Sequence, residues 1–266
     1  MSRTAWECME MIRHKGRPTI NDYIPLIFDE FYELHGDRNF GDDPAIIGGI
    51  GVLDGRPVTV IGQVKGRDLN ENKKTNFSMP QPEGYRKALR LMQQAEKFHR
   101  PVICFIDTPG AFCGVGAEER GQGEAIAKNL YEMMLLRTPI VSVVLGEGGS
   151  GGALALGVCD RLAMLQNAIY SAISPRGFAN ILWRDGSREK EAANIMRITA
   201  DDLVEFGVAE AVIEEGGRAA HRDKEQTAQN IKEYLTKEIP NLLQIPIDEL
   251  LKARYNKFRK IGEFEE

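Results

Sequence analysis

Five of the seven residues from 146 to 152 are glycine, in the run Gly-Glu-Gly-Gly-Ser-Gly-Gly. The apolar run 139–145 precedes them, and the helix-forming residues Ala-Leu-Ala-Leu follow at 153–156. Glycine adopts backbone angles that other residues avoid and lets a ligand approach the main chain, while the first N–H groups of a helix have no partner within that helix. The sequence therefore predicts a strand, a turn that holds negative charge, and the start of a helix.

One interpretation of this turn is a dinucleotide site, because residues 146–151 fit the pattern G-x-G-x-x-G. Such a site needs an acid for the ribose at the end of the next strand, and the next apolar stretch, 161–171, ends in Ile-Tyr-Ser without one. A second interpretation makes the backbone N–H groups near Gly151 and Gly152 an oxyanion hole, which needs no side chain. A tight turn that only packs a helix on a sheet explains Gly157, but it does not explain five glycines before the helix begins.

A third interpretation is a serine hydrolase, because residues 148–152 also fit the nucleophile elbow G-x-S-x-G. Ser150 would be the nucleophile, and Asp160 or Asp185 and then His221 follow it in the order that such hydrolases use. In so glycine-rich a run this match carries little weight, because the spacing arises easily.

The pattern of strand, turn and helix repeats along the chain. Apolar runs begin with proline at positions 57, 101 and 139, spaced by 44 and 38 residues. Proline is tolerated at the first position of a strand, and a period of about 40 residues is typical of stacked supersecondary units. The pair Asp54-Gly55, between the apolar runs 45–53 and 57–64, is a hairpin signal. The sequence therefore predicts an α/β fold built from ββα units.

The unit that begins at Pro101 contains a second glycine-rich turn. Residues 107–116, Asp-Thr-Pro-Gly-Ala-Phe-Cys-Gly-Val-Gly, follow the buried strand 101–106, and a helix is expected from about 117 to 137. Asp107 is expected to be a turn residue that bonds its own backbone before Pro109.

Composition limits the class of protein. With 266 residues, of which 42% are hydrophobic, the chain can form one α/β domain with helical additions. Its net charge of −5 argues against nucleic acid as the main partner, and no apolar run reaches the roughly 20 residues of a membrane span. The start of the chain lacks the apolar core of a secretory signal. The four cysteines are scattered and the four histidines lack ligand spacing, so we expect a cytoplasmic protein with no metal site on this chain.

A local excess of positive charge lies between residues 64 and 93. Lys65 and Arg67, with Lys73 and Lys74, fall in a polar loop before the expected helix that begins near Pro82. Basic residues in such a loop are free to meet an anionic group of a substrate, such as the phosphates of a nucleotide handle. The alternative is a solvated surface.

Several blocks of sequence together resemble a known family. The blocks are Glu33–Arg38, Pro82–Leu89, Phe105–Phe112, Gly116–Gln122, Gly146–Leu154 and Ser174-Pro175. In this order they resemble the carboxyltransferase α subunit of bacterial acetyl-CoA carboxylase over roughly residues 17–255. The resemblance implies a crotonase-like fold of ββα units, in agreement with the repeat.

The resemblance also implies a reaction and partners. The family transfers the carboxyl group of carboxybiotin, held on a biotin carboxyl carrier protein, to acetyl-CoA, giving malonyl-CoA for fatty acid synthesis. It works as an α2β2 heterotetramer whose β subunit carries a zinc ribbon and supplies the hole for the thioester enolate. The ureido oxygen of biotin gains negative charge when CO2 leaves, and the biotin anion can then take a proton from the acetyl methyl group. No catalytic histidine or serine is needed for that step.

The resemblance assigns roles to individual residues. Gly151 and Gly152 would form the oxyanion hole for the ureido oxygen through their N–H groups. Apart from the resemblance, we also expect substrate binding by Lys65 and Arg67 of the basic loop and by these residues of the two turns: Gly148, Gly149, Ser150, Gly110, Ala111, Phe112 and Gly114. Two positions depart from the family pattern, which often has proline at Cys113 and glutamate at Arg176, so an ion pair made by that glutamate is not expected in this chain.

The expected organisation has three parts. Residues 1–40 form an N-terminal helical segment, residues 41–215 the crotonase-like carboxyltransferase core, and residues 216–266 a helical region that packs on the core or on a partner subunit. The alternatives to the carboxyltransferase are another crotonase-fold acyl-CoA enzyme, the hydrolase that uses Ser150, and a non-catalytic scaffold for a partner enzyme.

Overall fold

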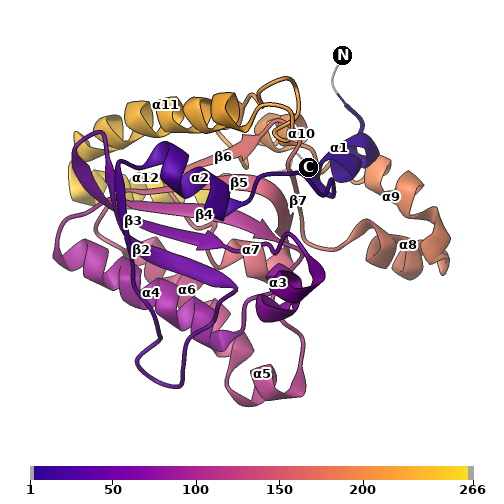
Figure 1. Cartoon of the computed structure of the whole chain (residues 1–266), viewed down its shortest axis with the longest axis horizontal. Helices are drawn as coiled ribbons and strands as arrows, with labels where there is room; N and C mark the ends of the chain where they lie inside the picture. The colour runs from indigo at the N-terminus through magenta and orange to yellow at the C-terminus, as the bar shows by residue number, and fades with distance from the viewer. Residues whose placement is uncertain (1–2, 263–266) are drawn as a thin grey trace.

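A single mixed sheet forms the centre of the computed structural model, which describes residues 3–262 (Figure 1). Its order is β1-β2-β3-β4-β5-β6-β8, and β7 pairs with the end of β5. The pairs β1–β2 and β2–β3 are antiparallel, and all others are parallel. The strands are β1 Glu30–Glu33, β2 Ile46–Leu53, β3 Arg56–Gln63, β4 Val102–Thr108, β5 Ile140–Gly149, β6 Arg161–Leu165, β7 Ile169–Ser171 and β8 Ala211–Ile213.

The hairpin predicted at Asp54-Gly55 is confirmed. It joins β2 to β3, with Leu53 opposite Arg56, and both turn residues have positive φ, +49° and +72°. Two positive φ values are the signature of the two-residue turn whose twist matches that of the strands. The hairpin begins the first ββα unit, so the predicted α/β architecture is present.

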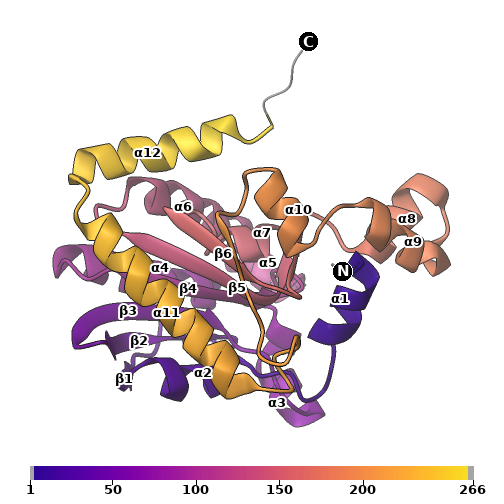
Figure 2. The ribbon, with the colours of Figure 1, turned by 90° about the horizontal axis from the view of Figure 1, so that it is seen from above.

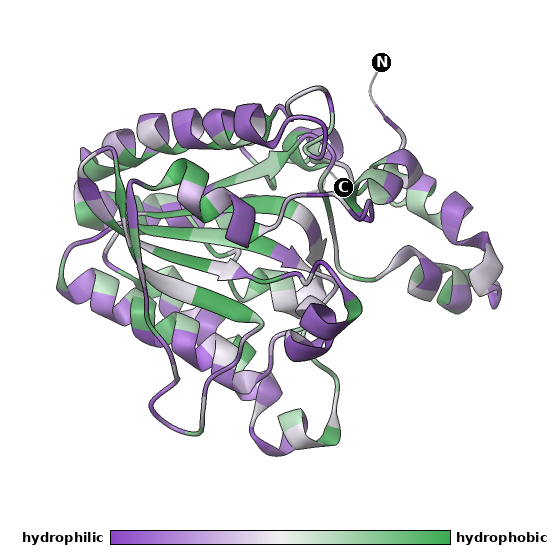
Figure 3. Cartoon of the chain, in the orientation of Figure 1, coloured by the Kyte–Doolittle hydropathy of each residue, from purple (hydrophilic) through white to green (hydrophobic). Residues whose placement is uncertain are grey.

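The central strands are apolar because helices cover both faces of the sheet. Every residue of β4 is buried, and its run Val-Ile-Cys-Phe-Ile shows none of the alternation of a half-exposed strand. Figure 3 shows these hydrophobic strands between helices whose outer faces are polar.

Helices α4 and α6 cover one face of the sheet, and α2 and α11 cover the other (Figures 1 and 2). The two short helices α8 and α9 extend to one side, away from the sheet. The α-helices are α1 Ala5–Ile12, α2 Ile20–Ile27, α3 Leu69–Lys74, α4 Pro82–Lys97, α5 Val115–Glu119, α6 Gln122–Leu135, α7 Ser150–Leu154, α8 Pro175–Trp183, α9 Glu189–Ile195, α10 Ala200–Glu205, α11 Lys224–Leu243 and α12 Ile247–Lys260. Short 3₁₀ turns lie at Asn76–Ser78 and Gly186–Arg188.

Two sequence expectations were wrong in detail. The single helix expected over about 117–137 is divided into α5 and α6, because Gly121 has φ +83° and breaks the helical path. The N-terminal segment contains α1 and α2 as expected, but it also contributes β1, which pairs with β2 at the edge of the sheet. The division of the chain into three parts stays a prediction.

The C-terminal helices pack on the core. α11 lies against α2, β5 and β8, and α12 lies against α6. Within residues 3–262, no helix is long and apolar enough to cross a membrane.

Candidate functional site

The two glycine-rich segments, here called the two glycine turns, lie against each other where β4 and β5 end. The turn predicted over residues 146–152 was wrong in detail, because β5 continues to Gly149 and α7 begins directly at Ser150, whose φ is +49°. A Cβ atom built on Gly149 would lie 2.2 Å from the carbonyl oxygen of Pro109, and one on Gly152 would lie 2.5 Å from the backbone nitrogen of Ala111. Backbone cannot move aside as a flexible side chain can, so only glycine fits at these two positions. The predicted site residues of the two turns are therefore adjacent in space.

The glycines of the run have different reasons to be glycine. A Cβ on Gly148 would lie 2.1 Å from a carbon of the Tyr170 ring, and one on Gly146 would lie 2.7 Å from the Asp107 carboxylate. Gly151 is different, because its Cβ would meet only Ile126, at 3.7 Å. The site is therefore tightly packed around Gly146, Gly148, Gly149 and Gly152, whereas a methyl group would fit at Gly151 without a clash.

The start of α7 presents backbone donors. Among the described residues, the N–H groups of Gly151 and Gly152 have no hydrogen-bond acceptor, since α7 begins at Ser150 and offers none. The N–H of Ala111, beside Gly152, likewise finds no acceptor in the described part of the chain. Donors of this kind can hold an oxygen anion.

Asp107 fastens the glycine run to the end of β4. Its carboxylate accepts the N–H of Glu147 at 3.0 Å and lies 3.4 Å from the Nζ of Lys65. The expectation that Asp107 bonds its own turn was wrong, because the N–H of Glu147 in the neighbouring strand β5 is close enough to donate to the carboxylate instead. Burial raises the pKa of the Glu147 carboxyl, and the positive charge of Lys65 opposes that shift.

The remaining predicted substrate-binding residues lie around the turns at different distances. Lys65 reaches the glycine run through Asp107, whereas the Arg67 guanidinium pairs with Asp22 of α2 at 2.7 Å. Phe112, which follows Ala111 in the second glycine turn, donates its N–H to the carbonyl of Pro80 in the segment before α4.

At Gly114 a Cβ would lie 2.5 Å from the Phe112 ring, so this loop folds back on that ring. The two departures from the family pattern, Cys113 and Arg176, are both exposed. The binding roles of all these residues stay predictions.

The residues of the proposed hydrolase triad do not come together. Ser150 has the elbow's positive φ, +49°, and is exposed. However, Asp160 is buried in an ion pair with Arg254, and Asp185 accepts hydrogen bonds from Ser187. The His221 ring stacks on His14, with centroids 3.9 Å apart. Within residues 3–262, neither carboxylate hydrogen-bonds to the histidine.

One residue that the sequence analysis missed lies between the two turns. The side chain of Gln63, at the end of β3, is completely buried and hydrogen-bonds to the backbone of Asp107 and of Gly152. Its only signal in the sequence is a polar amide in the apolar stretch 58–64.

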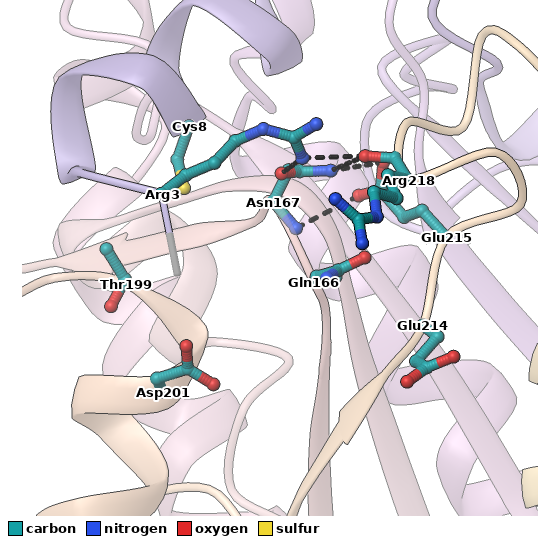
Figure 4. Close-up of a pocket in the computed structure, with 9 residues that line it drawn as sticks. All are labelled: Arg3, Cys8, Gln166, Asn167, Thr199, Asp201, Glu214, Glu215 and Arg218. Carbon is teal, nitrogen blue, oxygen red and sulfur yellow. Dashed lines mark hydrogen bonds between the residues drawn. The ribbon is translucent and has the colours of Figure 1, made fainter. Parts of the chain in front are cut away.

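A separate polar hollow of about 390 Å³ lies where α1 meets the ends of β6 and β8 (Figure 4). Arg3 contacts Asn167 and donates to the carbonyl of Arg218, while Asp201 and Glu214 line the opposite side. None of the predicted site residues lines this hollow. This hollow is therefore separate from the predicted site at the glycine turns.

Comparison with solved structures gives the same fold. A transcarboxylase 12S structure aligns with a TM-score of 0.66 at 22% identity, covering 88% of this chain and 45% of that chain. A Pseudomonas malonate decarboxylase hetero-tetramer in complex with coenzyme A aligns with a TM-score of 0.66 at 20% identity, covering 83% and 89%. The fold and the paired glycine turns define a crotonase-fold protein.

Sequence comparison gives the family. Residues 2–262 match the family described as "Acetyl co-enzyme A carboxylase carboxyltransferase-like". The chain is 60% identical to the acetyl-coenzyme A carboxylase carboxyl transferase subunit alpha of Clostridium acetobutylicum, over 98% of this chain and 95% of that protein. It is also 60% identical to a Clostridium tetani protein named for subunits beta/alpha, of which it spans 45%. The chain belongs to the acetyl-CoA carboxylase carboxyltransferase α-subunit family.

Proposed function

We propose that this chain, together with a β subunit, transfers the carboxyl group of carboxybiotin on a carrier protein to acetyl-CoA, forming malonyl-CoA. The observation that supports this proposal most directly is the pair of N–H groups at Gly151 and Gly152, which have no acceptor among residues 3–262 and lie where the two glycine turns meet. Release of CO2 from carboxybiotin leaves negative charge on the ureido oxygen. Fixed N–H donors stabilise that charge as it develops.

The donors at the turns fit a ureido oxygen in their chemistry. They are backbone N–H groups, which bind an oxygen anion and do not coordinate a cation. Gly151 is partly exposed and less crowded than the neighbouring glycines, which leaves room for a ring to approach the main chain. The biotin anion then serves as the base that takes a proton from the acetyl methyl group. The resulting enolate attacks CO2 and forms the new carbon–carbon bond.

A partner supplies the other half of the site. One oxyanion hole cannot stabilise both the biotin anion and the thioester enolate, so the β subunit, with its zinc ribbon, would provide the second hole in an α2β2 assembly in the cytoplasm. Two comparisons support a paired arrangement. The Clostridium tetani relative is named for both subunits in one chain, and the malonate decarboxylase with the same fold is a hetero-tetramer.

The test uses two neighbouring glycines in the assembly with the β subunit. Gly152→Ala places a Cβ against the backbone of Gly110 and Ala111, so it should displace the donors and lower kcat by about 10²–10³. Gly151→Ala keeps its N–H in place but adds a methyl group where the ring would bind, so it should weaken binding of the carboxybiotin carrier without displacing the donors. Circular dichroism and binding of the β subunit check that each variant folds and assembles. A folded, assembled Gly152→Ala enzyme with normal turnover would refute the assignment.

A further inference from the structure

We propose that Gln63 is a positioning residue, whose buried amide fixes the distance and orientation between the two glycine turns. This inference rests on the proposed function, since the turns matter only if their N–H groups act on an anion. Gln63 touches no expected substrate group. It acts through the backbone of Gly152.

The side chain of Gln63 spans three elements. Gln63 ends β3, which is next to β4 in the sheet but does not pair with β5. Its Oε1 accepts the N–H of Asp107 at 3.0 Å, where β4 ends. Its Nε2 donates to the carbonyl oxygen of Gly152 in α7 at 2.8 Å. The oxygen and the nitrogen of the Gln63 amide therefore each hydrogen-bond to the backbone of a different turn.

The carbonyl of Gly152 depends on this contact because α7 does not use it. In a regular α-helix the N–H of residue 156 would donate to the carbonyl of residue 152. Here the N–H of Leu156 donates to Ala153 at 3.1 Å, since α7 tightens after one turn. The hydroxyl of Tyr85 also faces the Gly152 carbonyl, but at 3.5 Å. That distance is too long for a strong hydrogen bond, so Gln63 is the main donor.

Loss of Gln63 would leave the N–H of Asp107 without its acceptor and the carbonyl of Gly152 with only the distant Tyr85 hydroxyl. A buried polar group left unpaired is costly, so the turns would rearrange to satisfy the Asp107 N–H and the Gly152 carbonyl. Rotation of the peptide groups at the start of α7 would also redirect the N–H groups of Gly151 and Gly152. An oxyanion hole works only when its donors lie about 2.7–3.1 Å from the oxygen that becomes charged. The expected consequence is a loss of turnover.

Two variants at position 63 separate the effects. Gln63→Leu removes both hydrogen bonds and keeps a side chain of similar volume. Gln63→Glu has the same shape and keeps an acceptor for Asp107, but when ionised it places an oxygen against the Gly152 carbonyl. The matched control is Ser142→Ala, because Ser142 is also completely buried and donates to a backbone carbonyl, that of Leu156, at 2.7 Å. That carbonyl lies beyond the C-terminal end of α7, away from the donors.

The experiment measures kcat, the KM for acetyl-CoA and the thermal midpoint of each variant in the assembly with the β subunit. Both Gln63 variants should lower kcat by about 10–100-fold, which is less than the loss expected when an N–H donor of the oxyanion hole is removed. The KM for acetyl-CoA should stay within about twofold of the wild type. Ser142→Ala should lower the thermal midpoint while leaving kcat within about twofold. A merely structural role would move the thermal midpoint of the Gln63 variants and not kcat.

The outcomes separate this inference from the proposed function. If Gly152→Ala loses activity and a folded Gln63→Leu or Gln63→Glu enzyme turns over like the wild type, the positioning role is overturned and the proposed function stands. If either Gln63 variant changes only the KM for acetyl-CoA, the role is also overturned. If the wild-type assembly forms no malonyl-CoA, the proposed function itself fails.

Discussion

Arg254 on α12 and Asp160, which precedes β6, form a buried two-pronged ion pair although they are 94 residues apart in the sequence. The Nε and one terminal nitrogen of Arg254 each lie 2.8 Å from a different oxygen of Asp160. The guanidinium also donates to the carbonyls of Met133, Leu136 and Thr138, so it caps the end of α6. This cluster fastens the C-terminal helix to the core and removes Asp160 from any catalytic role.

Replacement of Arg254 by methionine should destabilise the chain by about 3–5 kcal/mol, because Asp160 would keep a buried charge without its partner. The free energy of unfolding from urea titration measures the loss. Arg259→Met is the matched control, since Arg259 is exposed on the same helix, and its effect should stay within about 0.5 kcal/mol. A loss for Arg254→Met no larger than that of the control would contradict the buried-pair account.

The sequence predicted the repeating parts of this fold better than its single contacts. The hairpin at Asp54-Gly55 follows from local backbone preferences, so it could be predicted directly. The strand before the glycine run and the helix after it were also predicted, but the turn between them was not found, because β5 continues to Gly149 and α7 begins at Ser150. The contacts of Arg254 and Gln63 could not be predicted, because they join elements that meet only after folding. The break at Gly121 was also missed. A glycine inside a helical pattern is compatible with either a continuous or a divided helix.

Asp37 should give the chain a stability that depends on acid pH. Burial opposes its ionisation, but three backbone N–H groups and the Arg86 guanidinium hold the pKa of Asp37 at about 2, below its ordinary 3.8. A carboxyl whose pKa is lower in the folded state contributes stability above its unfolded pKa and loses it as the pH falls toward its folded pKa. The advantage of the wild type over Asp37→Asn should therefore be constant above about pH 5 and should shrink between about pH 4 and pH 2.

Urea midpoints of the wild type and of Asp37→Asn, measured in parallel at several pH values, test this expectation. The difference between the two proteins isolates Asp37 from other carboxyls that titrate in the same range, such as Asp42. A difference that does not change between pH 6 and pH 3 would show that the ionised form of Asp37 is not the stabilising one.

The basic loop should contribute to binding of an anionic substrate. Lys73 and Lys74 are exposed and, within residues 3–262, no carboxylate pairs with them, whereas Lys65 and Arg67 each have one acidic partner. Replacing all four by alanine should raise the KM for acetyl-CoA or for the carrier protein. The raised KM should depend less on salt than that of the wild type, because fewer positive charges remain for salt to screen. Lys252→Ala, which changes an exposed lysine of α12, is the control. Unchanged KM values and salt dependence would leave the loop as a solvated surface.

Ser150 distinguishes backbone chemistry from side-chain chemistry at the same turn. Its hydroxyl is exposed and its φ is +49°, as at a nucleophile elbow, so geometry at this residue alone does not decide the question. The N–H mechanism uses the amide that alanine retains, so Ser150→Ala should keep most of the turnover of the assembly. A hydrolase would instead lose its nucleophile, and its wild type would react with a fluorophosphonate probe.

The two measurements, turnover of Ser150→Ala and labelling of the wild type, give opposite answers for the two chemistries. The proposed carboxyltransferase is active as Ser150→Ala and stays unlabelled. A Ser150→Ala enzyme that folds, binds the β subunit and is nevertheless inactive, together with a labelled wild type, would restore the hydrolase. In that case His221 would have to leave its stack on His14 to reach the serine, because no other histidine follows Ser150 in the chain.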